Sequence, residues 1–293
     1  MADRRTEMQH PFGPGLHGQP AAAVLAAVLE GQREALGSLS ASLPALEQGS
    51  ELAAKCLISG GKLGYAGAGS SGLMAMADCL ELAGTFGIPP SKTPMLFAGG
   101  TAALLHMTGG VEDDADQAAR DVALAGLGKG DALICVAASG ATPYTLAAAR
   151  TARAAGAAVI GLANVEKAAL FDLSDVAVLI DSGPEIVAGS TRLGAATAQK
   201  VALNMMSVLI GIRLGAVHDG YMVNLVADNI KLLDRAARIV AAVAGTDDAQ
   251  AKTALRATNG AVKPAILVAC GHSTETAAAA LAASGGKLAP HLG

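Results

Sequence analysis

A short apolar run, a glycine-rich turn and a helix start follow one another at residues 62–83, and this unit constrains the fold most strongly. Leu63–Ala66 leads into Gly67-Ala68-Gly69-Ser70-Ser71-Gly72, and a helix-favouring segment follows. Glycine permits positive φ and a close approach of ligand to backbone. Hydroxyls beside the unpaired amides of a helix N-terminus favour an anion there. The sequence therefore predicts a strand–turn–helix unit whose turn cradles phosphate with Gly69, Ser70 and Ser71.

Two other interpretations of this turn stay open. Walker A requires Gly-Lys-Ser/Thr after four free residues, and no lysine follows here. The spacing Gly67-x-Gly69-x-x-Gly72 matches the dinucleotide fingerprint, which also needs an acidic residue about 20 positions later. Asp78 and Glu81 come too early and lie on the predicted helix. Nucleotide binding is therefore an alternative, and so is a tight turn without any ligand.

The rest of the chain repeats this alternation of strands and helices. Further apolar strands are expected at 95–98, 131–138, 158–162 and 176–180, and the run at 131–138 is continuously apolar, as in parallel sheets. Helices are expected at 21–36, 49–59, 71–83, 101–107, 114–126, after Pro143, at 189–212 and at 222–243. This rhythm predicts an α/β fold with a doubly wound, five-stranded parallel sheet. The predicted parts are a flexible arm at 1–19, the sheet domain with flanking helices at 20–244 and a helical tail at 245–293.

Two more hydroxyl-bearing turns accompany the first. Ser139, Gly140 and Thr142 stand between a strand and a helix with Pro143 near its first turn. Ser190 and Thr191 stand at the expected opening of the helix at 189–212. Each turn by itself is explained by helix capping, because Ser and Thr are good N-caps. Together they converge on the rim where open α/β sheets bind ligands, and they predict a phosphorylated small molecule.

Composition excludes several classes of partner. A formal net charge of −4 and only 2% aromatic residues argue against nucleic acid. The four cysteines are far apart and indicate thiols in a reducing cytosol. No apolar run follows the opening Met-Ala-Asp-Arg-Arg, and the apolar charge-free run at 132–149 is broken by Ser, Gly, Thr and Pro, so neither a signal peptide nor a membrane span is expected. The histidines are not clustered, so no metal site is expected.

Residues 60–240 resemble the sugar isomerase (SIS) fold in the version carried by N-acetylmuramic acid 6-phosphate etherases, to which glucokinase regulatory proteins are related. The stretches that carry this resemblance are Gly67–Gly72, Thr85-Phe86-Gly87, Gly110–Asp114, Ala137–Tyr144, Gly189–Arg192, Gly194–Lys200 and Leu203-Asn204-Met205. The tail, around Ala261–Ile266, resembles the ubiquitin-associated-like three-helix domain that ends these etherases.

The resemblance implies a substrate and a chemistry. The substrate is a 6-phosphorylated amino sugar that carries D-lactate as an ether at carbon 3. The enzyme removes the proton at carbon 2 of the open-chain aldehyde, expels lactate and adds water back at carbon 3. No metal or organic cofactor is implied, because the carbonyl already acidifies the carbon 2 proton and two acid/base groups suffice. A cytoplasmic location is expected because neither a signal peptide nor a membrane span is. The resemblance further implies a homodimer, with the apolar segment 201–212 as the candidate dimer helix.

The two acid/base groups of the family map onto Glu81 and Glu112. By resemblance Glu81 protonates the departing lactate oxygen and Glu112 takes the carbon 2 proton. Leu80 and Leu82 flank Glu81 near a helix C-terminus, and such surroundings raise the pKa of a carboxyl group. Without the family, Glu81 is most simply a solvated helix residue and Glu112 an N-terminal helix acid.

The chain departs from the family pattern at several positions. Leu73 and Ala141 stand where arginines are usual, and Asn224 stands where an aspartate is usual. Lys200 is expected to bind the phosphate, and Arg192 is another available cation. His106 is either a group that polarises the substrate or a structural histidine. A non-catalytic sugar-phosphate sensor and a sugar-phosphate isomerase are the alternative functions, and two opposed carboxylates favour a lyase over a sensor.

Overall fold

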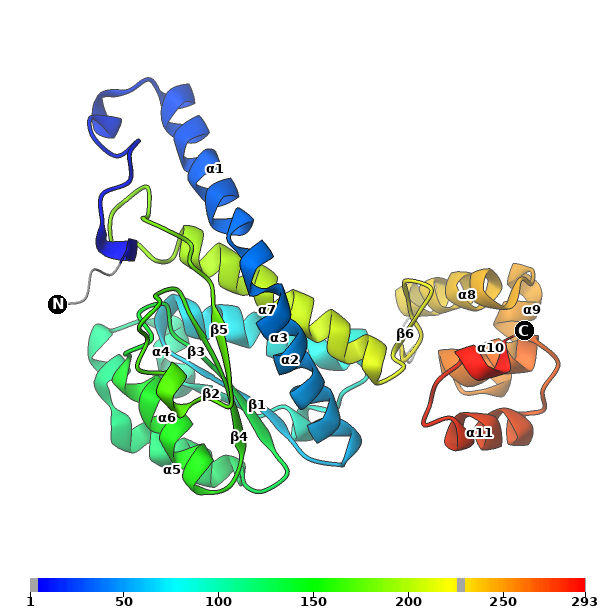
Figure 1. Cartoon of the computed structure of the whole chain (residues 1–293). Coiled ribbons are helices and arrows are strands. Elements are labelled where there is room, and N and C mark those ends of the chain that lie inside the picture. The colour runs from blue at the N-terminus through cyan, green and yellow to red at the C-terminus, as the bar shows by residue number, and fades with distance from the viewer. Residues whose placement is uncertain (1–4, 226–229, 293) are drawn as a thin grey trace. The chain divides into compact units, whose positions relative to one another are not determined.

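Five parallel strands form the central sheet, in the order β2-β1-β3-β4-β5 (Figure 1). The strands are β1 (Leu63–Gly67), β2 (Met95–Phe97), β3 (Ala132–Val136), β4 (Ala158–Ala163) and β5 (Val176–Leu179). The structure is a computed structural model that describes residues 5–225 and 230–292. It confirms the predicted α/β class and the five-stranded parallel sheet.

Seven helices accompany the sheet within these described ranges. They are α1 (Ala21–Gly37), α2 (Leu39–Ile58), α3 (Gly69–Phe86), α4 (Gly100–Leu105), α5 (Ala115–Ala125), α6 (Pro143–Ala154) and α7 (Gly194–Arg213). Short 3-10 turns lie at Arg5–Glu7, Leu16–Gly18, Pro90–Lys92, Gly109–Asp113 and Phe171–Leu173.

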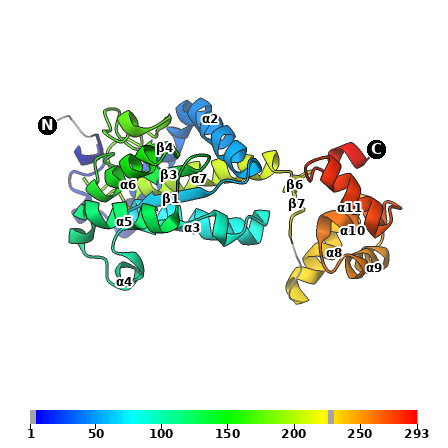
Figure 2. The same cartoon turned by 90° about the horizontal axis from the view of Figure 1, so that it is seen from below.

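The two faces of the sheet carry different helices, because successive side chains of a strand point to opposite faces. Val159 belongs to the apolar core beneath α5 and α6, which Figures 1 and 2 show side by side. Its neighbour Ile160 faces Gly49 of α2 on the other side, where Met206 of α7 also lies. Tyr65 of β1 reaches α3 on that second side, through a hydrogen bond to Asp78. The sheet is thus covered by α5 and α6 on one face and by α2, α3 and α7 on the other.

Two helices have bounds that differ from those expected. Helix α2 begins at Leu39, ten residues before the expected start at residue 49, and runs through Pro44. Burial of Leu39 and Leu46 and a hydrogen bond from the Ser42 hydroxyl to the Leu179 carbonyl hold this first part of the helix in place. Helix α7 begins at Gly194, not at residue 189, so Ser190 and Thr191 lie in the loop before it. Tertiary contacts therefore overrode local propensity at the start of α2.

The chain divides into two compact units, Met1–Leu80 with Pro90–Ser207 and Glu81–Pro89 with Val208–Gly293. The first holds the sheet. The second holds the last turns of α3 and α7, a small hairpin and the C-terminal helices. These elements are β6 (Val217–His218), β7 (Tyr221–Met222), α8 (Ile230–Ala244), α9 (Asp248–Ala257), α10 (Val262–Ala269) and α11 (Thr274–Ala283). Their buried apolar residues form a core separate from that of the sheet.

The tail contains three short helices, as expected. Asp247 caps α9, because its carboxylate accepts a hydrogen bond from the Gln250 amide at 2.8 Å. The expected helix at 222–243 is α8, which begins at Ile230, and residues 226–229 lie outside the described residues. The domain boundary expected at residue 245 stays a prediction.

One helix passes a test of length and apolar composition for crossing a membrane among the described residues. It is α7, and 56% of its apolar window is buried in the protein. The bent pair α10 and α11 passes only if the two helices are taken together as a single span.

Candidate functional site

The crevice between β1 and β3 is where this topology places a ligand. From β1 the chain continues to β2 on one side, and from β3 it continues to β4 on the other side. Ligands of open α/β sheets bind at such a switch point, beyond the carboxyl ends of the strands. The last residues of the two strands, Gly67 and Val136, are partners in register. The turns after them therefore open at the same place.

The first turn is closely packed and depends on glycine. A Cβ added at Gly67 would lie 2.8 Å from the Gly72 Cα, so these two backbone segments tolerate no side chain there. Gly69 has a φ of +54°, which favours glycine. Helix α3 begins at Gly69, so Ser70 and Ser71 lie in its first turn, as predicted. The first amides of a helix have no carbonyl partner within the helix, so a helix start at this position favours an anion.

Ser71 joins this turn to the second one. Its side chain is buried, and its oxygen accepts a hydrogen bond from the Ala138 amide at 3.2 Å. Ser139 follows immediately, and its oxygen accepts a hydrogen bond from the Ala141 amide, also at 3.2 Å. The hydroxyls of Ser139 and Thr142 are 3.5 Å apart, at the start of α6. The first two hydroxyl-bearing turns are thus brought together across the β1/β3 switch point.

Gly140 shapes the second turn. Its φ is +58°, and a Cβ there would lie 2.2 Å from the Ala168 Cβ. The Gly140 carbonyl accepts a hydrogen bond from the Leu170 amide at 2.9 Å, which fixes the turn to the loop after β4. Ala141, where the family carries arginine, is half-buried and contributes no charge. The second turn therefore offers hydroxyls and amides but no cation of its own.

Glu112 lies against the first turn. It belongs to the 3-10 turn Gly109–Asp113, and a Cβ added at Gly69 would lie 2.6 Å from its Oε1 atom. The side chain is half-buried. Burial raises the pKa of the Glu112 carboxyl group, and the charge of Asp113 raises it further. A carboxylate with a raised pKa is a stronger base, and it lies beside the proposed phosphate cradle.

Glu81 has other surroundings than the sequence led us to expect. It lies on α3 within the second unit, and its side chain is exposed. Leu82 is buried, whereas Leu80 is 69% exposed, so the two leucines do not enclose the carboxylate. The flanking residues alternate around the helix instead of forming an apolar pocket. The expectation that apolar neighbours desolvate Glu81 is therefore wrong.

The third hydroxyl-bearing turn is not a helix start. Glu185, which is 3% exposed, accepts hydrogen bonds at 2.8 Å from both the Gly194 and the Ala195 amides. It takes the place at the N-terminus of α7 that a bound anion would need. Among the described residues, no hydrogen bond joins Ser190 or Thr191 to the other two turns. Glu185 was missed by the sequence reasoning, since a capping residue nine positions before the helix leaves no local signal.

Lys200 and Asp78 are linked on the helices behind β1. Lys200 is exposed on α7, and its charge is among the influences that lower the pKa of Asp78. Burial is the largest influence and raises the pKa of Asp78 overall. The Asp78 carboxylate accepts hydrogen bonds from the hydroxyl of Tyr65 and from two side chains of α7, Asn204 and Ser207, at 2.8–3.0 Å. Asp78 thus joins β1, α3 and α7 through side-chain hydrogen bonds.

Asn224, which stands where the family carries an aspartate, has a structural role that depends on its amide group. Its side-chain amide donates a hydrogen bond to the Phe86 carbonyl at 2.8 Å, at the end of α3. An ionised aspartate has no proton to donate to that carbonyl. In this chain the residue therefore caps the helix that carries Glu81.

Metal ligation has no support among the described residues. No group of three or more His, Cys, Asp and Glu side chains there is placed to hold a metal ion. His106 is exposed at the end of α4. The two turns offer hydroxyls and amides, Glu112 adds a carboxylate, and the part played by the expected cations Lys200 and Arg192 stays a prediction.

Comparison with known proteins identifies the class first. Residues 30–164 match the SIS domain family. The fold is similar to that of a Bacteroides fragilis protein assigned as a phosphosugar isomerase involved in capsule formation, with a TM-score of 0.52, 20% identity and coverage of 69% of this chain and 95% of the other. The fold is also similar to that of an E. coli CFT073 protein solved in complex with a ligand. The TM-score is 0.50 and the identity 16%, and the match covers 69% of this chain and 97% of the other. The sheet unit is therefore a SIS domain.

The particular family follows from more similar proteins. An N-acetylmuramic acid 6-phosphate etherase of Deinococcus radiodurans is 43% identical over 99% of this chain and 95% of its own length. The etherase of Geobacillus thermodenitrificans is 38% identical, over 90% of this chain and 89% of its own length. That of Streptomyces avermitilis is 42% identical, over 80% and 75%. This chain belongs to the N-acetylmuramic acid 6-phosphate etherase family.

Proposed function

We propose that this protein is a carbon–oxygen lyase that cleaves the D-lactyl ether of N-acetylmuramic acid 6-phosphate. The products are N-acetylglucosamine 6-phosphate and D-lactate. The observation that carries the proposal is the 43% identity to an etherase over 99% of the chain. The cradle at the β1/β3 switch point, with Glu112 against its first turn, agrees with such a substrate.

The phosphate is held by the turns and not by a metal. Ser70 and Ser71, at the start of α3, and Ser139 and Thr142, at the start of α6, offer hydroxyl and amide donors to its oxygens. Gly69 and Gly140 allow the backbone to approach the ligand. Ser190, Thr191 and Lys200 complete the proposed set. The N-termini of α3 and α6 supply part of the positive potential that arginines supply elsewhere in the family.

Glu112 takes the proton at carbon 2 of the open-chain sugar. Its raised pKa leaves it a stronger base, and the ionised form is required for the abstraction. Electrons from the broken C–H bond form the enolate, and the bond from carbon 3 to the lactate oxygen then breaks. Glu81 protonates that oxygen and, now ionised, takes a proton from the water that adds to carbon 3, while the protonated Glu112 returns a proton to carbon 2. The reaction proceeds without an organic cofactor.

The protein works as a homodimer in the cytoplasm. Val208 and Ile212 lie one helical turn apart on α7, and 48% and 49% of their surfaces are exposed. Exposed apolar side chains at this spacing form a stripe that suits helix packing. Light scattering of the protein in solution tests the dimer, and a monomer at micromolar concentration contradicts it.

Incubation with N-acetylmuramic acid 6-phosphate, followed by an enzymatic assay of D-lactate, tests the function. Lactate release that depends on the protein is expected. Binding of the sugar phosphate without lactate release supports a sensor and contradicts the lyase. Interconversion of an aldose and a ketose phosphate without lactate release supports an isomerase instead.

The division of labour between the carboxylates has its own test. Glu81→Gln is expected to abolish lactate release, while exchange of the carbon 2 proton with deuterated water persists. Glu112→Gln is expected to stop both, because the base is lost. Release of lactate by Glu81→Gln at the wild-type rate contradicts the assignment. NMR of the sugar follows the exchange, and the lactate assay follows the elimination.

A further inference from the structure

The N-terminal arm is attached to the loop that follows β5. The Gly189 amide donates a hydrogen bond to the Thr6 carbonyl at 3.0 Å, and Thr6 is 1% exposed. Arg5 forms an ion pair with Asp181, near the beginning of the same loop. A Cβ added at Gly189 would lie 2.8 Å from a carboxylate oxygen of Glu7. Three consecutive arm residues thus contact both ends of the segment 181–189.

A second attachment joins the arm to α1. His10 is 2% exposed, and its Nε2 atom lies 3.0 Å from a carboxylate oxygen of Glu34. The Phe12 amide donates a hydrogen bond to the Nδ1 atom of the same ring at 3.1 Å. Nδ1 is therefore the acceptor, and Nε2 donates its proton to Glu34. The arm is thus fixed between α1 and the loop.

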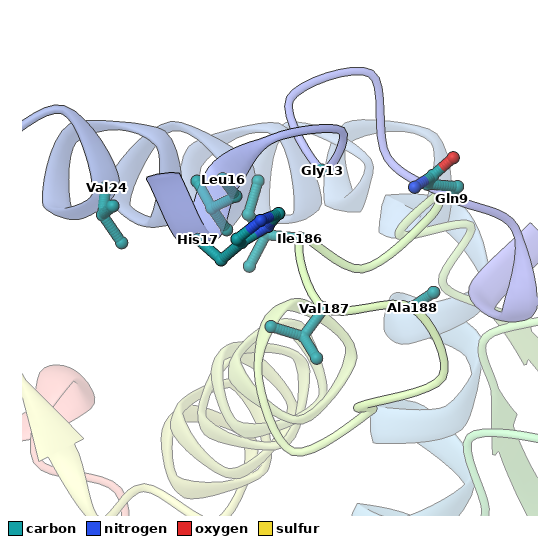
Figure 3. Close-up of a pocket in the computed structure, with 8 residues that line it drawn as sticks. All are labelled: Gln9, Gly13, Leu16, His17, Val24, Ile186, Val187 and Ala188. Atoms are coloured by element: carbon teal, nitrogen blue, oxygen red, sulfur yellow. The ribbon is translucent and has the colours of Figure 1, made fainter. Parts of the chain in front are cut away.

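Between these attachments the arm does not pack closely. Figure 3 shows a pocket of about 540 Å³ between the arm, α1 and residues 186–188. Its walls are formed by Gln9, Gly13, Leu16, His17, Val24, Ile186, Val187 and Ala188. The polar contacts described above therefore join the arm to the loop and to α1 around this pocket.

The same loop continues into Ser190 and Thr191. Within the 181–189 segment Glu185 caps α7, and beyond that segment the Leu193 amide donates a hydrogen bond to the Ser190 carbonyl. We propose that residues 5–13 act as a clasp that sets the conformation of the 181–189 segment and so positions Ser190 and Thr191 for the substrate phosphate. The part that concerns substrate rests on the function proposed above. Arg5, Thr6 and His10 are positioning residues, since they act on the loop and not on the sugar.

A matched pair of glycine variants separates the clasp from simple backbone strain. Gly189 and Gly183 both have a φ of +74°, so alanine at either position is strained to a similar degree. Only Gly189→Ala drives a Cβ into the Glu7 carboxylate. A Cβ at Gly183 would have the Arg5 guanidinium as its nearest neighbour, at an ordinary contact distance of 3.8 Å. We expect Gly189→Ala to raise KM for the sugar phosphate well above that of Gly183→Ala, with a smaller change in kcat. Equal KM values in the two variants overturn the proposal.

The hydrogen-exchange rate of the Gly189 amide tests the clasp without an activity assay. Arg5→Ala removes a partly exposed ion pair, so the Gly189 amide is expected to exchange roughly two- to fivefold faster. The Gly194 and Ala195 amides, which Glu185 binds, serve as an internal control and are expected to keep their rates. Reversal of both charges, in the double variant Arg5→Asp with Asp181→Arg, is expected to restore slow exchange and the wild-type KM.

The outcomes of these measurements are distinct. Unchanged exchange at Gly189 in Arg5→Ala contradicts the clasp itself. Faster exchange with an unchanged KM contradicts its role in positioning Ser190 and Thr191. If the wild-type protein releases no lactate, the proposed function fails, and the dissociation constant for a sugar 6-phosphate then replaces KM in the same comparison.

Discussion

At the scale of single residues, the site depends on the contact between Gly69 and Glu112. Because Gly69 has no Cβ, the Oε1 atom of Glu112 can lie against the start of α3, where a side chain at that position would meet it. The N-terminus of α3 favours the ionised form of that carboxylate, while burial and Asp113 act in the opposite direction. The net raised pKa suits a base that abstracts a weakly acidic proton near neutral pH.

Gly69→Ala tests this contact. The new Cβ would lie 2.6 Å from Oε1 of Glu112 and would displace the base, so lactate release is expected to fall by at least about tenfold. Gly126→Ala is the control, because Gly126 has a similar φ of +59°. A Cβ added at Gly126 would meet only the flexible end of the Lys62 side chain. Both variants are expected to lose about 1 kcal/mol of stability. A similar loss of activity in both contradicts the role of the contact.

Asp113→Asn tests the electrostatics of the base. The charge of Asp113 raises the pKa of Glu112, so its removal lowers that pKa. Glu112 must be ionised to act, and the rate falls as the pH drops below its pKa. The acidic limb of kcat/KM is therefore expected to move to lower pH in Asp113→Asn. Asp116→Asn, which changes an exposed acid of α5, is expected to leave the limb in place.

At the scale of elements, the tail contains a buried lysine on α10. Lys263 is 9% exposed, and its amino group donates a hydrogen bond to the Gly286 carbonyl at 2.6 Å. Burial lowers the pKa of Lys263 to about 8. Among the described residues, no carboxylate forms an ion pair with it. The folded tail therefore carries the cost of a buried charge at neutral pH.

This burial gives the stability of the tail a pH dependence of known sign. Between the folded pKa of about 8 and the usual value of 10.5, the unfolded chain binds more protons, so stability rises with pH across this window. Below pH 8 both states are charged and this contribution is constant. Lys263→Met has no amino group that titrates. The excess of its free energy of unfolding over that of the wild type is therefore expected to shrink as the pH rises from 8 to 10.5.

Urea unfolding followed by circular dichroism measures that difference at several pH values. Lys287→Met is the matched control, because Lys287 is an exposed lysine of the same unit. A constant difference between Lys263→Met and the wild type across the window contradicts the assignment of the buried charge.

At the scale of the whole molecule, the phosphate cradle and the helical tail belong to different compact units. A ligand that binds only the folded sheet unit stabilises that unit by mass action. The product, N-acetylglucosamine 6-phosphate, at 100 times its dissociation constant is expected to add about 2.7 kcal/mol. For a unit of this size that corresponds to a rise in Tm of about 5–10 °C.

Hydrogen exchange locates the stabilisation. Slower exchange is expected in β1, β3 and the first turn of α6, and no change is expected in α9, α10 and α11. Glucose without phosphate is the control ligand and is expected to have no effect. Equal protection of the tail helices contradicts a phosphate site confined to the sheet unit.

The alternation of strands and helices, the two turns at the β1/β3 switch point and the family could be predicted from the amino-acid sequence. These depend on local signals, namely apolar periodicity, glycine at positions of positive φ and hydroxyls before a helix. The contact of Glu112 with Gly69, the place of Glu185 at the start of α7 and the role of Asp78 in joining three elements could not be predicted in this way. The structure also shows that the side chain of Glu81 is exposed to solvent. The physical reason is that pairing and burial of distant side chains depend on how elements pack, which no local pattern along the chain records.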